Sequence, residues 1–69
     1  MNRNQMEGAW QEFRGKVREQ WGRLTDDDLD VINGKHDQLI GKIQQRYGMV
    51  QEEAERSVRE WWDRIAVEG

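Results

Sequence analysis

Apolar residues recur every three or four positions through the first third of the chain. The series consists of Met6, Trp10, Phe13, Val17, Trp21 and Leu24. At about 100° per residue, this spacing places the side chains on one face of a helix. It therefore predicts a single amphipathic helix that ends at Gly22 or just after it. Asn4 and Glu7 have the spacing of an N-terminal capping box for this helix.

The next segment contains a second helix start. Thr25 can act as the N-cap and Asp28 stands in the reciprocal capping position, with acidic residues beside the positive end of the helix dipole. Asn33 and Gly34 predict the end of this short helix, because both residues tolerate a left-handed conformation. An alternative stays open, since four apolar residues remain in phase across Gly34 and also suit one continuous helix: Leu29, Ile32, Leu39 and Ile43.

Two further helices complete the pattern. The third carries Leu39, Ile40, Ile43 and Tyr47 and is expected to end at Gly48. The fourth runs from about Val50 to Ile65, with these residues inward or partly inward: Val50, Ala54, Val58, Trp61, Trp62 and Ile65. Three pairs at i,i+4 support it: Glu52 with Arg56, Glu55 with Arg59, and Glu60 with Arg64. The chain has no proline and no alternating β pattern, so the predicted fold class is all-α.

An internal repeat organises these helices. The phrase GKVREQWG at 15–22 returns as GKIQQRYG at 41–48, and a shift of 26 residues also aligns the flanking apolar positions. The repeat predicts a small four-helix domain made of two duplicated helical hairpins, about 4–33 and about 34–66. Because neither hairpin can bury its apolar face alone, the two are expected to pack on each other.

Six glycines, at positions 8, 15, 22, 34, 41 and 48, form a stripe opposite the apolar face of each copy. An interior glycine costs about 1 kcal/mol relative to alanine, so Gly15 and Gly41 weaken their helices. Three explanations stay open. The outer face tolerates glycine, with Gly22 and Gly48 as caps; another helix or a partner approaches closely; or a low helix propensity lets the fold loosen and re-form with water activity.

Composition narrows the functional classes. The 69 residues suffice for one domain, 1–69, with one small core, and the absence of cysteine excludes disulfides and cysteine zinc sites. Charged residues make up 36% of the chain but the net charge is only −3, which suits a soluble helical surface. No apolar run exceeds three residues and no signal peptide is evident, so we expect no membrane span and a cytoplasmic location.

Candidate chemistry is sparse. Asp26, Asp28 and Asp30 imitate half of a calcium loop, but Val31 stands where glycine is needed and Asp37 where a bidentate Glu is expected, so helix capping is the preferred interpretation.

His36 is the only histidine, which favours partial burial at a helix start over metal binding. Ser57 has no His or Asp partner by spacing, and no Gly-Lys pair sits in a phosphate loop. We therefore expect no enzyme activity, no cofactor, and no catalytic, cofactor-binding or metal residues.

Two other residue sets suggest binding surfaces. Basic residues are frequent in the first and third helices: Arg14, Lys16, Arg18, Arg23, Lys35, Lys42 and Arg46. Acidic residues interrupt both sets and the pI is about 5.1, so nucleic-acid binding is not expected. Trp10 and Trp21 are predicted to lie in the core, whereas Trp61 and Trp62 lie about 100° apart, which places one of them near the surface.

The segments GKVREQWGRLTDDD and GKHDQLIGKIQQRYG closely resemble the CsbD-like family of small bacterial general-stress proteins, over roughly residues 4–48. The resemblance implies a cytoplasmic bacterial protein of the general, osmotic or stationary-phase stress response, with a SAM-like arrangement of two hairpins. The composition also resembles that of hydrophilins. The family motif implies structural roles only, with Gly15, Gly22, Gly41 and Gly48 as motif glycines and Trp10, Phe13, Val17, Leu39, Ile43 and Tyr47 in the core.

The expected function is therefore that of a non-enzymatic stress protein which protects other macromolecules or binds them weakly. The alternative is a specific protein-interaction module that uses the glycine stripe or the Trp61/Trp62 surface. We expect a monomer, with weak self-association and an unidentified protein partner left open.

Overall fold

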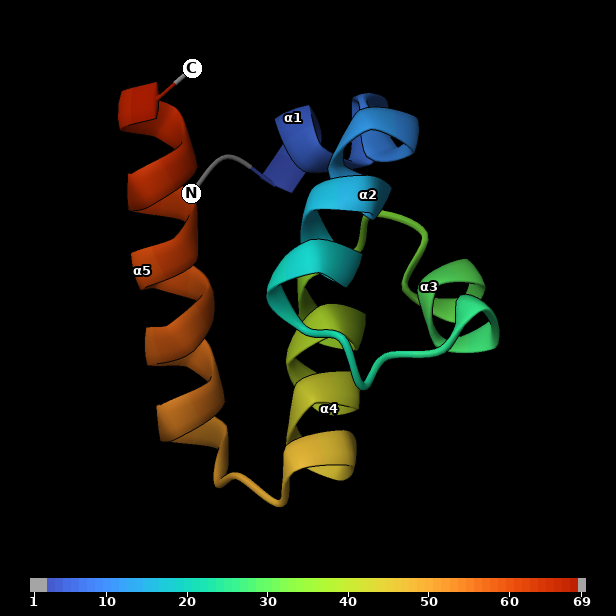
Figure 1. Cartoon of the computed structure of the whole chain (residues 1–69), viewed down its shortest axis with the longest axis vertical. Coiled ribbons are helices and arrows are strands. Elements are labelled where there is room, and N and C mark those ends of the chain that lie inside the picture. Colours follow the sequence, from blue (N-terminus) through green and yellow to red (C-terminus); the bar gives the residue numbers. More distant parts are fainter. Residues whose placement is uncertain (1–2, 69) are drawn as a thin grey trace.

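The computed structural model describes residues 3–68, and side chains are described for residues 5–65. This part of the chain contains helices and no strands, which confirms the all-α prediction. The five helices are α1 (Arg3–Gly8), α2 (Trp10–Gln20), α3 (Asp26–Ile32), α4 (His36–Tyr47) and α5 (Gln51–Glu68), shown in Figure 1.

The first predicted helix is interrupted at Ala9, so the single helix expected there was wrong and five helices replace four. Ala9 has φ −120° and ψ 33°, which ends α1 and starts α2 in a new direction. Met6 and Trp10 are nevertheless both buried, so their spacing could not reveal the break. The Asn4 capping box was also wrong, because Asn4 already lies inside α1; its side chain falls outside those described.

α1 is held against the turn between α3 and α4. An ideal Cβ added to Gly34 would lie 2.7 Å from the Cα of Glu7, and Gly34 has φ +82°. Only glycine satisfies both the close approach and the left-handed backbone without strain. The close-approach explanation is therefore confirmed at Gly34, where the approaching helix is α1.

The C-terminal end of α2 lies earlier in the chain than predicted. α2 stops at Gln20, and Trp21 is its C-cap, with its amide donating to the Val17 carbonyl at 2.8 Å. Gly22 is not among the glycines with positive φ, so it is not a left-handed cap. The cap prediction holds for Gly48, with φ 66° and ψ 31° at the end of α4.

The start and end of α3 follow the prediction. The Thr25 hydroxyl accepts from the Asp28 amide at 3.1 Å, and the Asp28 carboxylate accepts from the Thr25 amide at 3.0 Å. Asn33, with φ 44°, and Gly34 then turn the chain, and Lys35 donates to the Ile32 carbonyl at 2.8 Å. The break between α3 and α4 is thus confirmed, and a continuous helix is excluded.

The repeat predicts that Val50 points inward, and this prediction was wrong. Its side chain is 68% exposed, whereas its counterpart Leu24 is buried. Val50 precedes α5 and accepts from the Ala54 amide at 3.0 Å, which is the position of a helix N-cap. At that position its side chain faces out of the turn.

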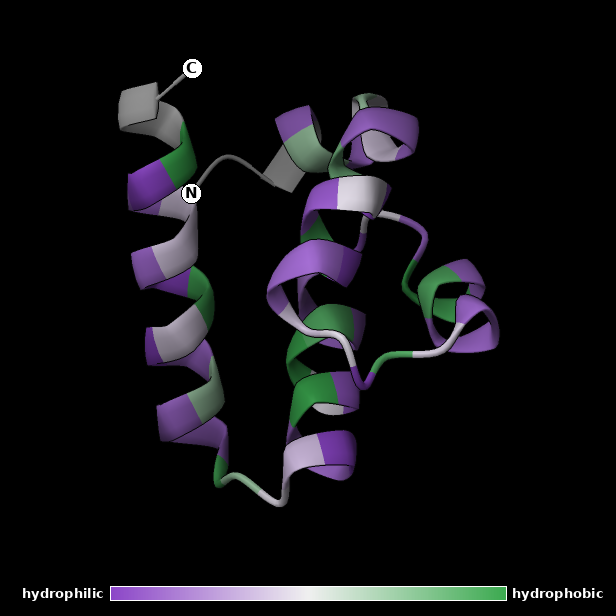
Figure 2. Ribbon diagram, in the orientation of Figure 1, coloured by the Kyte–Doolittle hydropathy of each residue, from purple (hydrophilic) through white to green (hydrophobic). Residues whose placement is uncertain are grey.

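The helices form three layers. α5 lies on one side and α3 on the opposite side, with α2 and α4 between them (Figure 1), and both α3 and α5 pack on α4. Apolar residues face this interior, as the green segments in Figure 2 show. The core consists of Met6, Trp10, Val17, Trp21, Leu24, Leu29, Ile32, Leu39, Ile40, Ile43, Ala54, Val58 and Trp61.

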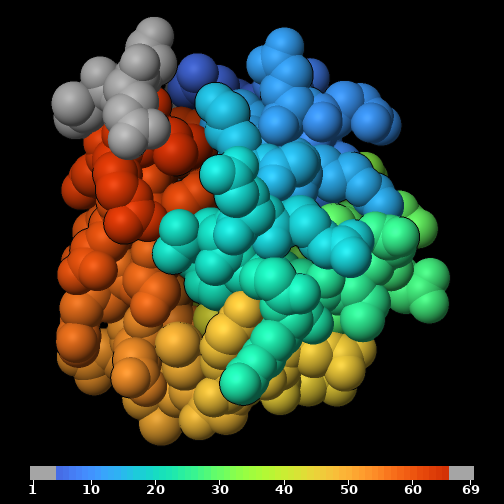
Figure 3. Space-filling view, viewed as in Figure 1, coloured from blue at the N-terminus to red at the C-terminus, as the bar shows by residue number. Residues whose placement is uncertain are grey.

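α2 and the turn after it fill the space between α5 and α3 on the face seen in Figure 3. Phe13 and Tyr47, both expected in the core, are only partly buried against it. α4 and α5 form a hairpin, but its counterpart is divided into α1, α2 and α3. The SAM-like packing of two equivalent hairpins therefore stays a prediction.

Candidate functional site

Asp28 is the centre of the main polar cluster. Its side chain is 3% exposed, and it is the one buried charged residue among the side chains described. Arg46 donates to both carboxylate oxygens, from Nε to Oδ2 at 2.8 Å and from Nη2 to Oδ1 at 3.0 Å. Lys42 Nζ lies 3.5 Å from Oδ1. The capping box thus places the carboxylate at the start of α3, and two cations one turn apart on α4 neutralise it.

These contacts keep Asp28 ionised. The hydrogen bond from Arg46 and then that from the Thr25 amide hold the pKa of the Asp28 carboxyl well below its usual range, although burial acts in the opposite direction. The same pairing raises the pKa of Arg46. Both groups therefore remain charged at neutral pH, and the cluster has a structural role between α3 and α4.

The other two carboxylates of the proposed half calcium loop face a different helix. Arg14 Nη1 lies 2.6 Å from Asp30 Oδ1, and Arg18 Nη1 contacts Asp26 Oδ1. Asp26 and Asp30 thus pair with α2, whereas Asp28 pairs with α4. In the part of the chain that the structure describes, no three His, Cys, Asp or Glu side chains gather as a metal site would require. The capping interpretation is confirmed by the hydrogen bonds of Thr25.

The basic residues of α2 and α4 are largely engaged by this arrangement. Arg14 and Arg18 on α2, and Lys42 and Arg46 on α4, all pair with acidic residues of α3. The two basic residues on each helix are one helical turn apart. The frequency of basic residues in these two helices therefore has an explanation within the chain.

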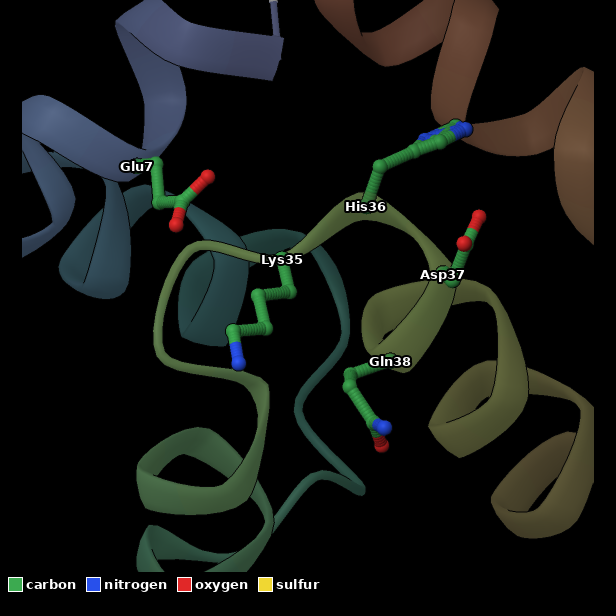
Figure 4. Close-up of a pocket in the computed structure, with 5 residues that line it drawn as sticks. All are labelled: Glu7, Lys35, His36, Asp37 and Gln38. Atoms are coloured by element: carbon green, nitrogen blue, oxygen red, sulfur yellow. The ribbon is translucent and has the colours of Figure 1, made fainter.

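His36 lies at the start of α4 and is partly buried, as expected. It borders a shallow pocket of about 310 Å³ with Glu7, Lys35, Asp37 and Gln38. Figure 4 shows that these side chains spread in different directions, with His36 directed toward α5 and Lys35 and Gln38 pointing the other way. Their polar groups do not converge on one point, as the groups of a binding site would.

Ser57 lies beside a second hollow, of about 260 Å³, between the ends of α2 and α4 and the side of α5. Its hydroxyl donates to the Glu53 carbonyl one turn earlier, at 3.0 Å. Tyr47 borders the same hollow, and its hydroxyl accepts from the Arg23 amide at 3.2 Å. The Ser57 and Tyr47 hydroxyls therefore both bind backbone groups of the same domain.

The two C-terminal tryptophans differ in environment, as their spacing predicted. Trp61 is buried and meets Trp21 edge to face, with ring centroids 5.2 Å apart. Trp62 is partly buried and stacks on Phe13, also at 5.2 Å and with 25° between the rings. These contacts join α2 to α5. The Trp61/Trp62 surface of the alternative hypothesis is reduced to the outer part of Trp62.

The interior glycines have no close neighbours. A Cβ added to Gly15 or Gly41 would meet no other atom within 4 Å, apart from its own helix backbone. Within this domain, close approach therefore does not explain these two residues. Both are exposed on the outer sides of α2 and α4.

Of the three expected pairs in α5, only Glu52 with Arg56 makes a contact, at 4.0 Å. Glu55 instead accepts from Gln51 at 3.1 Å. Arg64 donates to Gln20 on α2 at 2.9 Å.

Sequence reasoning also missed the pairing of Asp28 with α4. One signal was present, because Asp28 lies one turn before Ile32 and so shares its inward face.

Together, these features define a small helical domain whose helices pack around one apolar core and are linked by a buried carboxylate and cross-helix ion pairs. Within the residues described, no helix combines the length and apolar character that a membrane crossing needs. The model of the CsbD-like family matches residues 4–56, and the chain belongs to this family of general stress-response proteins.

Bacterial relatives support the same assignment over nearly the whole chain. A UPF0337 protein of Pectobacterium atrosepticum is 59% identical over 63 residues, covering 91% of each chain. The UPF0337 protein YjbJ of Escherichia coli K12 is 56% identical over 61 residues, covering 88% of each. A UPF0337 protein of Pseudomonas aeruginosa is 46% identical over 65 residues, which span 94% of this chain and all of the relative.

Proposed function

We propose that this chain is a non-enzymatic, cytoplasmic protein of the bacterial general stress response, which protects other macromolecules during osmotic or stationary-phase stress. The family match over residues 4–56 is the observation that carries the proposal. We further propose that the protein acts as a monomer, and that it binds neither a cofactor nor nucleic acid.

The surface described above supports a protective role. The mean hydropathy of −1.16 is strongly hydrophilic, and the large apolar side chains are mostly directed into one core. Four cations of α2 and α4 are paired with three carboxylates of α3. A hydrated surface with interspersed charges favours solubility at high concentration over tight binding of one partner.

A drying assay tests protection directly. A labile client enzyme is dried and rehydrated with this protein, or with an inert protein of equal mass at the same concentration. We expect more client activity to be recovered with this protein, and the benefit to survive Glu12→Gln on the exposed side of α2. No benefit over the inert protein contradicts the proposal.

The alternative of a specific interaction module makes a different prediction. Trp62 retains a partly exposed ring, so Trp62→Ala should abolish crosslinking to one defined partner in stressed cells while Glu12→Gln should not. Recovery of the same partner with the parent chain and its loss with Trp62→Ala would favour the module. A fluorescence titration with DNA and RNA at low salt tests the expectation about nucleic acid, and saturable binding would contradict it.

A further inference from the structure

α3 is held by two boundaries of different character. Toward α4, the buried Asp28 cluster joins the two helices, and Leu29 and Ile32 belong to the common core. Toward α2, the cross-helix ion pairs are Arg14 with Asp30 and Arg18 with Asp26. We call these four residues the α2–α3 seam.

The two boundaries differ in the exposure of their carboxylates. The Asp30 and Asp26 side chains are 67% and 75% exposed, against 3% for Asp28. The cations of the two boundaries are similar, with side chains 28% and 49% exposed for Arg14 and Arg18, and 22% and 39% for Lys42 and Arg46. α3 lies at the side of the molecule opposite α5 (Figure 1), and Asn33 and Gly34 connect it to α4 through a left-handed turn. The seam carboxylates are thus open to solvent ions, whereas the Asp28 carboxylate is not.

Salt acts unequally on the two boundaries. The screening length falls from about 8 Å at physiological ionic strength to about 3 Å at 1 M, and exposed pairs are screened much more than buried ones. Raised salt therefore weakens the α2–α3 seam and leaves the contact between α3 and α4 largely intact.

We propose that the α2–α3 seam is an ionic-strength switch, which opens at high salt while α3 stays attached to α4. Opening uncovers the part of the core that lies between α2 and α3, such as Val17, which precedes Arg18 in α2 and is buried in the closed form. The apolar surface available for client contact thus increases when cell solutes become concentrated. Only this physiological role rests on the proposed function.

Amide hydrogen exchange on the isolated protein tests the switch. The reporters are the Leu29 amide, which donates to Thr25, and the Asn33 amide, which donates to Leu29. These bonds belong to α3, and a helix of seven residues depends on packing for its stability, so they open more often once the seam no longer holds α3 against α2. An exposed pair shifts an equilibrium by a factor of roughly 1.5 to 5, so screening two pairs should accelerate exchange at α3 by about fivefold between about 50 mM and about 1 M potassium chloride. Amides in the middle of α5 serve as the internal reference.

Matched variants separate the seam from general effects of salt. Arg14→Gln with Arg18→Gln should exchange rapidly at α3 in both salts. Lys16→Gln with Arg23→Gln removes the same charge from outside the seam and should behave as the parent chain does. Asp26→Asn with Asp30→Asn removes the acidic partners of the same ion pairs. If one of the two double variants does not fold, the other still tests the seam.

An equal response of α3 and α5 to salt in the parent chain would overturn the proposal. So would a salt response at α3 that persists in both folded seam variants. Because the measurement uses no client, either result leaves the protective function to be decided by the drying assay. Conversely, a drying assay that shows no protection does not contradict the ionic-strength switch.

Discussion

Replacing Gly15 or Gly41 by alanine should stabilise the protein. Each residue lies inside a helix, on an exposed side, and an added Cβ meets no neighbouring atom within 4 Å. Glycine at such a position leaves the unfolded chain more freedom and contributes no side-chain contact to the folded one. The structure shows no compensating benefit for either glycine within the domain.

The gain follows from helix propensity. Alanine is better than glycine by about 1 kcal/mol in a helix interior, so each substitution should raise the free energy of unfolding by about that amount. The two sites are in different helices and share no side-chain partner, so the double variant should gain about 2 kcal/mol. For a domain of this size, that corresponds to a rise of roughly 8 to 16 °C in melting temperature.

Urea unfolding followed by tryptophan fluorescence measures the effect, since Trp21 and Trp61 are buried in the folded state. Two other glycines serve as controls, because their substitution by alanine should lower the free energy of unfolding. Gly48→Ala has open space but a φ of +66°, so it should lose about 1 kcal/mol. Gly34→Ala should lose more, because its Cβ would also collide with the Glu7 backbone.

A loss of stability in Gly15→Ala or Gly41→Ala would refute this reasoning. Sedimentation of the same variants addresses the remaining explanations of the glycine stripe. Stabilisation without any change in self-association removes close approach of a second copy. Stabilisation together with weaker client protection would support the hypothesis that low helix propensity is useful.

Four other substitutions test the cap of α3 and the contacts between helices. Thr25→Ala removes the N-cap of α3 and should lower the free energy of unfolding by about 1 kcal/mol, measured by urea unfolding. The pKa of Asp28 is lower in the folded than in the unfolded state, so the unfolded chain binds more protons below about pH 4, and stability should fall as pH decreases. Asp28→Asn should flatten this acid limb, and an unchanged limb contradicts the pairing with Arg46. Trp61→Ala should cost about 4 kcal/mol and the half-buried Trp62→Ala about 2 kcal/mol, and the reverse order in urea unfolding would contradict the assigned burial.

Local signals predicted the helix ends that depend on neighbouring residues. The Thr25 cap and the turn at Asn33 and Gly34 arise from side chains and backbone preferences within a few residues, so they can be inferred from sequence. The break at Ala9 could not, because the chain changes direction while Met6 and Trp10 both stay inward. Periodicity records which face is apolar and is insensitive to a bend that preserves that face.

The repeat predicted residue types better than environments. Leu24 and Val50 align, yet Leu24 follows the end of α2 and is buried, whereas Val50 precedes α5 and is exposed. The partnership of Asp28 with Arg46 was also beyond local reasoning, since these residues are 18 positions apart and meet only because α3 packs on α4.

The contact between Glu7 and Gly34 constrains the order in which the chain can fold. α1 is synthesised before the other helices, but part of the surface that receives it is the turn at Gly34. That surface exists only after the chain has turned from α3 into α4. We therefore expect α1 to dock late, although it leaves the ribosome before the helices that form its docking surface.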